Sequence, residues 1–177
     1  MKAVLITAAV AIIVVIAVVI VVLATRPSTS GSADASASAE NSHVLDDAGP
    51  DAPVLVEFLD FECESCGALF PIVEQLRSDY AGEITYVVRY FPLPGHVNSM
   101  NAAVAAEAAA QQGEFEAMYR HLFETQAEWG EQRESQPEIF RAFAEELGLD
   151  MAAFDAAVAD PATQERVEQD FTDGQAL

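Results

Sequence analysis

Residues 54–91 read VLVEFLDFECESCGALFPIVEQLRSDYAGEITYVVRYF, and this stretch decides the fold of the chain. Residues 54–61 are rich in β-branched and aromatic residues and almost continuously apolar, which predicts a strand covered on both faces. Residues 63–78 carry apolar side chains at helical spacing, and residues 83–91 again have the composition of a strand. A strand, a helix and a strand in so short a stretch predict a βαβ unit with parallel strands.

The chain after this unit has the pattern of helices separated by Gly and Pro residues. We expect helices at residues 99–111, 114–125, 137–147, 151–159 and 162–173. Pro71 lies inside the earlier helix, where it removes one backbone hydrogen bond and should kink the helix. The sequence therefore predicts an α/β fold in which a helical block follows the βαβ unit.

The N-terminus carries a long apolar run at residues 3–24, in which Thr7 is the one polar residue. At helical rise this run covers about 33 Å, close to the thickness of a bilayer's hydrocarbon core. We expect a membrane anchor at residues 1–26, a flexible Ser/Ala-rich linker at 27–44 and a folded domain at 45–177. A cleaved signal peptide is the alternative, although its apolar stretch would be shorter and its cleavage site closer.

The charge of the chain is concentrated after the apolar run. All 29 acidic residues lie at or after Asp34, with only six of the eight basic residues, so this part carries a net charge of −23. Such a charge repels phosphate backbones and anionic lipid surfaces. It therefore excludes a nucleic-acid-binding function and indicates an acidic, soluble surface.

The chain has two cysteines, Cys63 and Cys66, spaced as C-x-x-C at the start of a predicted helix. A disulfide across so short a loop constrains the unfolded chain very little, so a structural bridge explains the pair poorly. The free N–H groups and the dipole of a helix N-terminus favour the thiolate of Cys63, while Cys66 lies one turn further in. The spacing therefore predicts a redox pair, in which one thiol forms a mixed disulfide and the other resolves it.

Other uses of a C-x-x-C motif fit this sequence less well. A haem attachment motif needs His directly after the second cysteine, where this chain has Gly67. Zinc needs four ligands, and His43, His96 and His121 lack ligand spacing to the cysteines. We expect neither a metal nor a cofactor besides the redox-active disulfide itself. An inert buried pair of thiols remains an alternative.

Residues 56–71, VEFLDFECESCGALFP, resemble the active-site segment of the DsbA-like thiol–disulfide oxidoreductases, which have the thioredoxin fold. A strand leads into C-x-x-C, Pro71 follows Cys63 by eight residues, and Glu57 precedes Cys63 by six. A helical block after the second strand also matches, and RYFPLPGHVNSMNAA at residues 89–103 is similar to the membrane-tethered bacterial branch. The resemblance covers residues 45–177 and implies a thioredoxin-like fold with a helical insertion.

Glu57 interrupts an otherwise apolar strand. A carboxyl group that is desolvated there has a raised pKa and can accept a proton near neutral pH. The resemblance implies that Glu57 serves the thiol of Cys66 during catalysis. The alternative is an ordinary strand residue that faces solvent.

Further residues near the cysteines carry weaker predictions. Asp60, Glu62 and Glu64 surround Cys63 with negative charge, which predicts a redox potential less oxidising than that of DsbA itself. His96 matches a recurrent family position, but a loop-surface role is favoured over catalysis. We expect a group of apolar and aromatic side chains to pack the helical block and contribute to a substrate groove, namely Phe115, Tyr119, Leu122, Phe123 and Trp129.

The resemblance also implies parts that these residues do not contain. Relatives continue into a cis-proline loop, two further strands and a helix, whereas no proline follows Pro161 here. We therefore expect a domain truncated before the cis-proline loop, without its C-terminal ββα part. A sheet left in that state would have an open apolar edge.

The function that follows is an extracytoplasmic thiol–disulfide oxidoreductase in the bacterial cell membrane, anchored by a single span at residues 3–24. Its expected partners are the thiols or disulfides of exported proteins and a membrane redox partner that recycles the C-x-x-C pair. Two alternatives stay open. One is a reductase dedicated to a single partner, such as an apocytochrome in maturation, and the other is a non-catalytic binding or holdase module.

Overall fold

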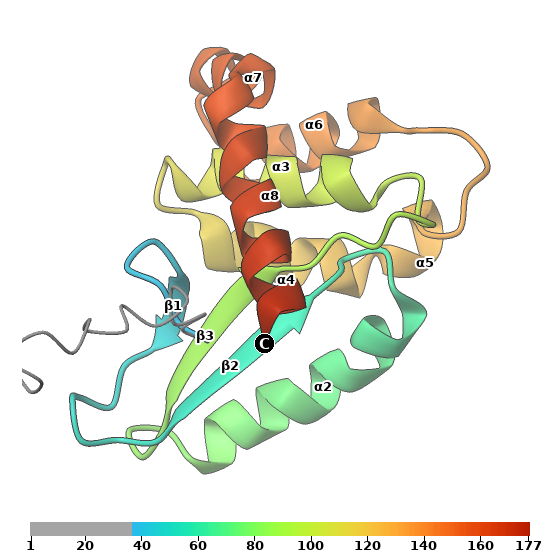
Figure 1. Cartoon of the computed structure of the whole chain (residues 1–177). Coiled ribbons are helices and arrows are strands. Elements are labelled where there is room, and N and C mark those ends of the chain that lie inside the picture. The colour runs from blue at the N-terminus through green and yellow to red at the C-terminus, as the bar shows by residue number, and fades with distance from the viewer. Residues whose placement is uncertain (1–36) are drawn as a thin grey trace, which may run out of the picture. The chain divides into compact units, whose positions relative to one another are not determined.

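The computed structural model describes residues 37–177 (Figure 1). The expected membrane anchor at residues 1–26 and residues 27–36 of the expected linker lie outside this part of the chain. Within residues 37–177, no helix is both long and apolar enough to cross a bilayer. The anchor therefore stays a prediction.

A three-stranded sheet in the order β1-β3-β2 supports the fold, with β1 at His43–Asp46, β2 at Val54–Leu59 and β3 at Thr85–Tyr90. Strands β2 and β3 run parallel, in a register that extends from Val54 opposite Thr85 to Leu59 opposite Tyr90. Helix α2 (Glu64–Asp79) connects these two strands. The predicted βαβ unit is thus confirmed.

Strand β1 was not predicted, and its pairing makes β3 the middle strand of the sheet. It begins at His43, inside the expected linker, and pairs antiparallel with β3. Among the described residues β2 pairs with β3 alone and is therefore an edge strand there, and Val54 and Leu55 at its start are 54% and 39% exposed. The expectation that β2 is covered on both faces was therefore wrong for its first half. Local hydrophobicity does not reveal which strand lies in the middle of a sheet.

Helices follow β3 to the end of the chain. Their bounds are α3 (Ser99–Ala110), α4 (Phe115–Glu124), α5 (Gln126–Trp129), α6 (Pro137–Glu146), α7 (Met151–Ala159) and α8 (Pro161–Ala176). The five predicted helices are confirmed to within a few residues, whereas the short helix α5 was not predicted. Along residues 37–177, no strand follows β3 and no peptide bond is cis.

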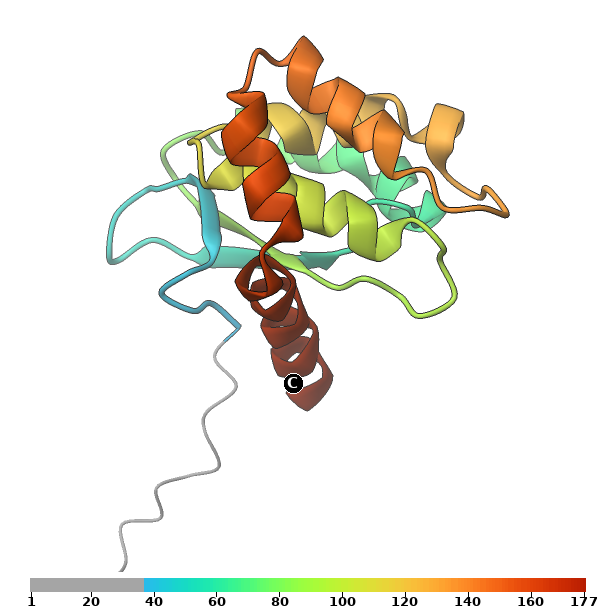
Figure 2. The same cartoon turned by 90° about the horizontal axis from the view of Figure 1, so that it is seen from above.

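The sheet is covered by helices on both faces. Helices α2 and α4 lie on one face, and α8 crosses the other face and contacts β2 and β3 (Figures 1 and 2). The close approach of α8 depends on Gly174, because a Cβ atom there would come within 2.8 Å of Phe58 and 2.9 Å of Phe91. Side chains alternate along β2, so Glu57 points to the face opposite Phe58, toward α2 and α4.

Candidate active site

Cys63 and Cys66 lie where the turn after β2 enters helix α2. Cys63 is the N-cap residue, with an extended backbone (φ −69°, ψ 120°), and no side chain caps the helix there. Its N–H donates to the carbonyl of Asp60 at 3.2 Å, and its own carbonyl accepts from the N–H of Gly67 at 3.0 Å. Both thiols are free and half-buried. The predicted placement of the pair at a strand–helix junction is thus observed.

The Cys66 thiol holds its proton tightly. Burial, with smaller contributions from Cys63 and Glu57, raises the pKa of Cys66 to about 12, while a backbone hydrogen bond with Asp60 acts in the opposite direction. At neutral pH, Cys66 is therefore a thiol and not a thiolate. Any reaction in which its sulfur acts as a nucleophile needs a group that removes this proton.

Glu57 lies half-buried on β2, close enough to Cys66 for their charges to interact. Burial raises the pKa of its carboxyl above the ordinary value, and the neighbouring Glu74 adds to the increase. A hydrogen bond from Tyr86 acts in the opposite direction. Glu57 is therefore not a solvent-facing strand residue, and it has the desolvated environment that its place in an apolar strand predicted.

Tyr86, on the neighbouring strand β3, is a site residue that was not predicted from the sequence. Its hydroxyl donates to Oε2 of Glu57, and the hydroxyl of Tyr119 on α4 lies 3.5 Å from that of Tyr86. A tyrosine in a predicted strand is ordinary, so its residue type gave no signal. Only the pairing register, which sets Leu55 opposite Tyr86, brings this tyrosine next to Glu57.

Asp60 is buried in the turn and connects it to the segment after β3. Its Oδ2 accepts from Nδ1 of His96 at 2.6 Å and from the N–H of Leu93 at 3.0 Å. Its Oδ1 accepts from the hydroxyl of Ser99 at 2.7 Å and from the N–H of Glu62 at 2.8 Å. Each oxygen of the Asp60 carboxylate thus accepts two hydrogen bonds. Although desolvation lowers the pKa of His96, the hydrogen bond and the charge of Asp60 outweigh it and raise that pKa.

Glu62 is also buried, and its Oε2 accepts from the N–H of Asn98 at 2.6 Å. Glu64, in the first turn of α2, is exposed. Two of the three acids expected to surround Cys63 are therefore bound to the segment that precedes α3. They organise the turn, a role that was not predicted from the sequence.

Gln126, the first residue of α5, contacts the cysteine turn directly. Its Nε2 donates to the carbonyl of Phe61 at 2.6 Å and to that of Cys63 at 2.9 Å. Its Oε1 fills the space beside Gly67, where a Cβ atom would collide with it. Gln126 was not predicted as a site residue because it lies 63 positions away from Cys63 and in a helix that was itself not predicted.

Aromatic side chains fill the space between the sheet and the helical block. Phe61 packs against Phe123 with ring centroids 5.2 Å apart, and Phe70 stacks on Phe123 at 5.1 Å. The packing predicted for the helical block is confirmed by the burial of Phe115, Tyr119, Leu122, Phe123 and Trp129. These contacts hold the cysteine turn against α4.

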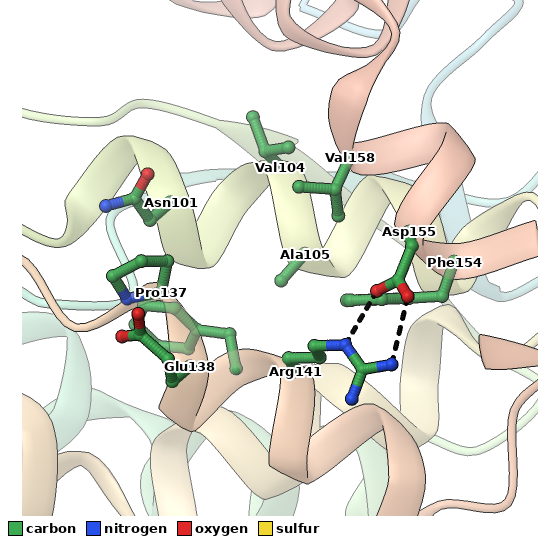
Figure 3. A pocket seen from close by; sticks show the side chains of 10 residues that line it. Asn101, Val104, Ala105, Pro137, Glu138, Arg141, Phe154, Asp155 and Val158 are labelled. Atoms are coloured by element: carbon green, nitrogen blue, oxygen red, sulfur yellow. Dashed lines mark hydrogen bonds and ion pairs between the residues drawn. The ribbon is translucent and has the colours of Figure 1, made fainter. Parts of the chain in front are cut away.

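A hollow of about 230 Å³ lies elsewhere, among helices α3, α6 and α7 (Figure 3). Apolar side chains such as Val104 and Phe154 line it. Arg141 and Asp155, also in its wall, form a bidentate ion pair with N···O distances of 2.8 and 2.9 Å. It contains none of the predicted site residues. Across residues 37–177, no group of three or more His, Cys, Asp or Glu side chains is arranged to hold a metal ion.

A family model described as thioredoxin matches residues 48–177. The match begins just before β2 and includes the C-x-x-C turn and the whole helical block. It therefore covers most of the chain and all of the candidate site.

Curated relatives include two proteins named as Na(+)/H(+) antiporters. NhaA 1 of Mycobacterium sp. (strain KMS) is 38% identical over 144 residues, which are 78% of this chain and 22% of that protein. NhaA 3 of Salinispora tropica is 41% identical over 125 residues, covering 69% of this chain and 18% of that protein. The chain thus spans about a fifth of the length of these relatives, and the transport in their names belongs to those proteins.

Solved structures with a similar fold include proteins named as oxidoreductases. A thioredoxin-like oxidoreductase from Silicibacter pomeroyi superposes with a TM-score of 0.65 at 27% identity, over 82% of this chain and 79% of that one. α-DsbA1 of Wolbachia pipientis superposes with a TM-score of 0.63 at 21% identity, over 76% of this chain and 68% of that one. MdbA of Corynebacterium diphtheriae superposes with a TM-score of 0.57 at 22% identity, over 75% of this chain and 70% of that one. The last two likenesses concern the fold alone.

Proposed function

The chain belongs to the thioredoxin family, and on that premise we propose that its Cys63–Cys66 pair exchanges disulfides with protein thiols. One observation carries the proposal. The half-buried Cys66 thiol, which is too weak an acid to ionise at neutral pH, lies close enough to the half-buried carboxyl group of Glu57 for their charges to interact, and the pKa of that carboxyl group is raised. A pair of thiols with its own proton acceptor is suited to disulfide exchange.

In the reducing direction, the thiolate of Cys63 attacks a disulfide of a substrate protein, and one substrate sulfur leaves as a thiolate. Glu57 then takes the proton of Cys66, and the Cys66 sulfur attacks Sγ of Cys63. The second substrate sulfur leaves as the Cys63–Cys66 disulfide forms. The protein's dithiol loses two electrons, and the substrate disulfide becomes two thiols.

In the oxidising direction the same steps run in reverse. A substrate thiolate attacks Sγ of Cys63 in the oxidised pair, and Cys66 leaves and takes up a proton from Glu57. A second substrate thiolate then displaces Cys63 and closes the substrate disulfide. Each direction needs an external partner, a dithiol donor or a disulfide acceptor, to restore the pair.

We further propose that the protein works outside the cytoplasm, anchored in the bacterial cell membrane through residues 3–24. The length and apolarity of that run support the anchor, and the persistence of disulfides in exported proteins supports the location. The substrates would then be thiols or disulfides of exported proteins, and a membrane redox partner would recycle the pair. Protease protection of the full-length protein in intact and opened cells tests this topology.

The central test compares full-length wild type with Cys63→Ser in insulin reduction and in oxidation of a dithiol peptide. We expect Cys63→Ser to lose both activities, and Cys66→Ser to accumulate a mixed disulfide with substrate. Unchanged turnover in Cys63→Ser would contradict the enzyme and favour a binding or holdase module. Slow turnover of insulin with fast reaction of one exported partner would instead indicate a dedicated reductase.

A further inference from the structure

Glu57 lies in a group of polar side chains between the sheet and helices α2 and α4. This Glu57 cluster consists of Glu57, Glu74, Arg77, Tyr86 and Tyr119. The Tyr86 hydroxyl donates to Oε2 of Glu57. The other carboxylate oxygen, Oε1, accepts no hydrogen bond from the residues that the structure describes. One oxygen of Glu57 is thus held, and the other is available to an external donor.

Tyr86 is a permanent donor to this carboxylate. It is fully buried, and burial raises its pKa far above the ordinary value, with further increases from Tyr119 and Glu57. A phenol has one proton to donate. Because Tyr86 gives its proton to Glu57, the Tyr119 hydroxyl, 3.5 Å away, can only donate to the Tyr86 oxygen. The donors therefore run from Tyr119 to Tyr86 and from Tyr86 to Glu57.

Across residues 37–177, no basic side chain lowers the pKa of Glu57. Arg77 lies over the ring of Tyr86, with Cζ 5.2 Å from the ring centre. Its guanidinium is bound to Glu74 at 2.7 Å and to two further carboxylates, those of Asp46 and Glu116. Glu74 is also paired with Arg120, and its remaining charge disfavours ionisation of Glu57. Of the groups that act on Glu57, Tyr86 is the one that stabilises the carboxylate.

We propose that Tyr86 is a positioning residue for disulfide exchange, which keeps Glu57 ionised and leaves its Oε1 to accept the proton of Cys66. The inference rests on the proposed function and adds the group on which Glu57 depends. Without the Tyr86 hydroxyl, burial and Glu74 both favour the neutral acid, which cannot take a proton. When the Tyr86 hydroxyl is present, its hydrogen bond opposes burial and Glu74, and the carboxyl group of Glu57 can both accept and release a proton.

The direct test is the titration of Glu57 in the full-length protein with Tyr86→Phe. A matched control is Tyr90→Phe, because Tyr90 is also buried on β3 and its hydroxyl binds His43 and Glu107 instead. The carboxyl carbon of Glu57, assigned with Glu57→Gln, is followed by NMR as pH changes. We expect a higher midpoint in Tyr86→Phe and the wild-type midpoint in Tyr90→Phe. A wild-type midpoint in Tyr86→Phe would overturn the inference.

A kinetic test follows the attack by Cys66. Reduced protein is mixed with oxidised glutathione, and the release of glutathione from the mixed disulfide on Cys63 is timed. We expect Tyr86→Phe to slow this step about tenfold at pH 7, with the difference closing as the pH rises and Glu57 ionises. Equal slowing at every pH would indicate structural damage alone and would count against the inference.

A measurement on wild type covers the case in which Tyr86→Phe fails to fold. The Tyr86 hydroxyl proton should give a slowly exchanging NMR signal that moves as Glu57 titrates, and its absence would refute the hydrogen bond. The two proposals can also fail separately. A wild type that exchanges no disulfides refutes the proposed function, whereas the Glu57 midpoint still decides the role of Tyr86.

Discussion

The side-chain amide of Gln126 donates to the backbone carbonyl of Cys63 at 2.9 Å, and thereby joins the helical block to the cysteine turn. The same nitrogen donates to the carbonyl of Phe61 at 2.6 Å. These two carbonyls lie on either side of Glu62, at the point where the turn becomes α2. The geometry of the C-x-x-C pair thus depends on a residue of a helix that lies far away in the sequence.

Replacement of Gln126 by Ala should loosen this turn. The carbonyl of Phe61 loses the Gln126 amide and that of Cys63 keeps only the N–H of Gly67, so we expect a loss of roughly 1–3 kcal/mol of unfolding free energy, measured by urea denaturation. We also expect slower disulfide exchange with unchanged secondary structure by circular dichroism. Gln132→Ala is the matched control, because the amide of Gln132 makes one long, exposed bond to Gly130 at 3.4 Å. Similar losses in both variants would contradict a specific role of Gln126.

Gly67→Ala should affect the turn through Gln126. The added methyl group occupies the space of the Gln126 amide oxygen, and this flexible side chain must move away. Because both changes remove the same contact, we expect the exchange rate of Gly67→Ala/Gln126→Ala to equal that of the single variants. Additive losses in this double-mutant cycle would show that the two residues act independently.

Glu57→Gln should stabilise the protein while slowing exchange. Burial raises the pKa of Glu57, so the folded state binds its proton more tightly than the unfolded state does. The stability from this group is therefore present below the unfolded pKa of about 4.3 and is lost as the pH rises through the folded pKa. Glutamine does not ionise, so its advantage should grow from near zero at pH 4 to on the order of 1 kcal/mol at pH 8. Denaturation midpoints at several pH values measure this, and a constant difference would refute it.

The Cys66 thiol should become reactive toward alkylating reagents only at strongly alkaline pH. Its pKa of about 12 leaves little thiolate at pH 7, so alkylation should be more than about a hundredfold slower than for a free cysteine peptide. In Cys63→Ser the neighbouring sulfur is absent, which removes part of the increase and should move the alkylation profile to lower pH. The rate of iodoacetamide labelling against pH tests both expectations. Rapid labelling of Cys66 at pH 7 in this variant would contradict the burial that raises its pKa.

The attachment of α8 to the sheet should depend on Asp170. This buried carboxylate binds the guanidinium of Arg89 on β3 and accepts from the N–H of Tyr90 at 3.1 Å. We expect Asp170→Ala to cost roughly 3–5 kcal/mol of unfolding free energy, because it leaves a buried positive charge with fewer partners. Asp155→Ala, which breaks the exposed pair with Arg141, should leave the unfolding midpoint nearly unchanged. Equal effects would show that α8 is held by other contacts.

Several parts of the fold follow from local patterns and were predicted from the sequence. The segments of β2 and β3 are short, nearly continuous apolar runs, and α2 and five of the later helices repeat their apolar residues at the period of a helix. The position of Cys63 at a helix start follows in the same way. Strand β1 was not predictable in this way because four residues are too few to show a period, and it is held by contacts such as His43 with Glu107 at 2.9 Å.

The sequence by itself therefore determined the β2–α2–β3 unit and the order of five later helices, the C-x-x-C pair at a strand–helix junction, and a carboxyl group six residues before Cys63. The tertiary structure decided which groups act on that pair. Tyr86 reaches Glu57 only through the register of two parallel strands. Gln126 reaches Cys63 only because helix α5 lies against the turn. The physical reason is that hydrophobic periodicity is a local property of the chain, whereas hydrogen bonds between distant residues exist only after the helices and strands have packed.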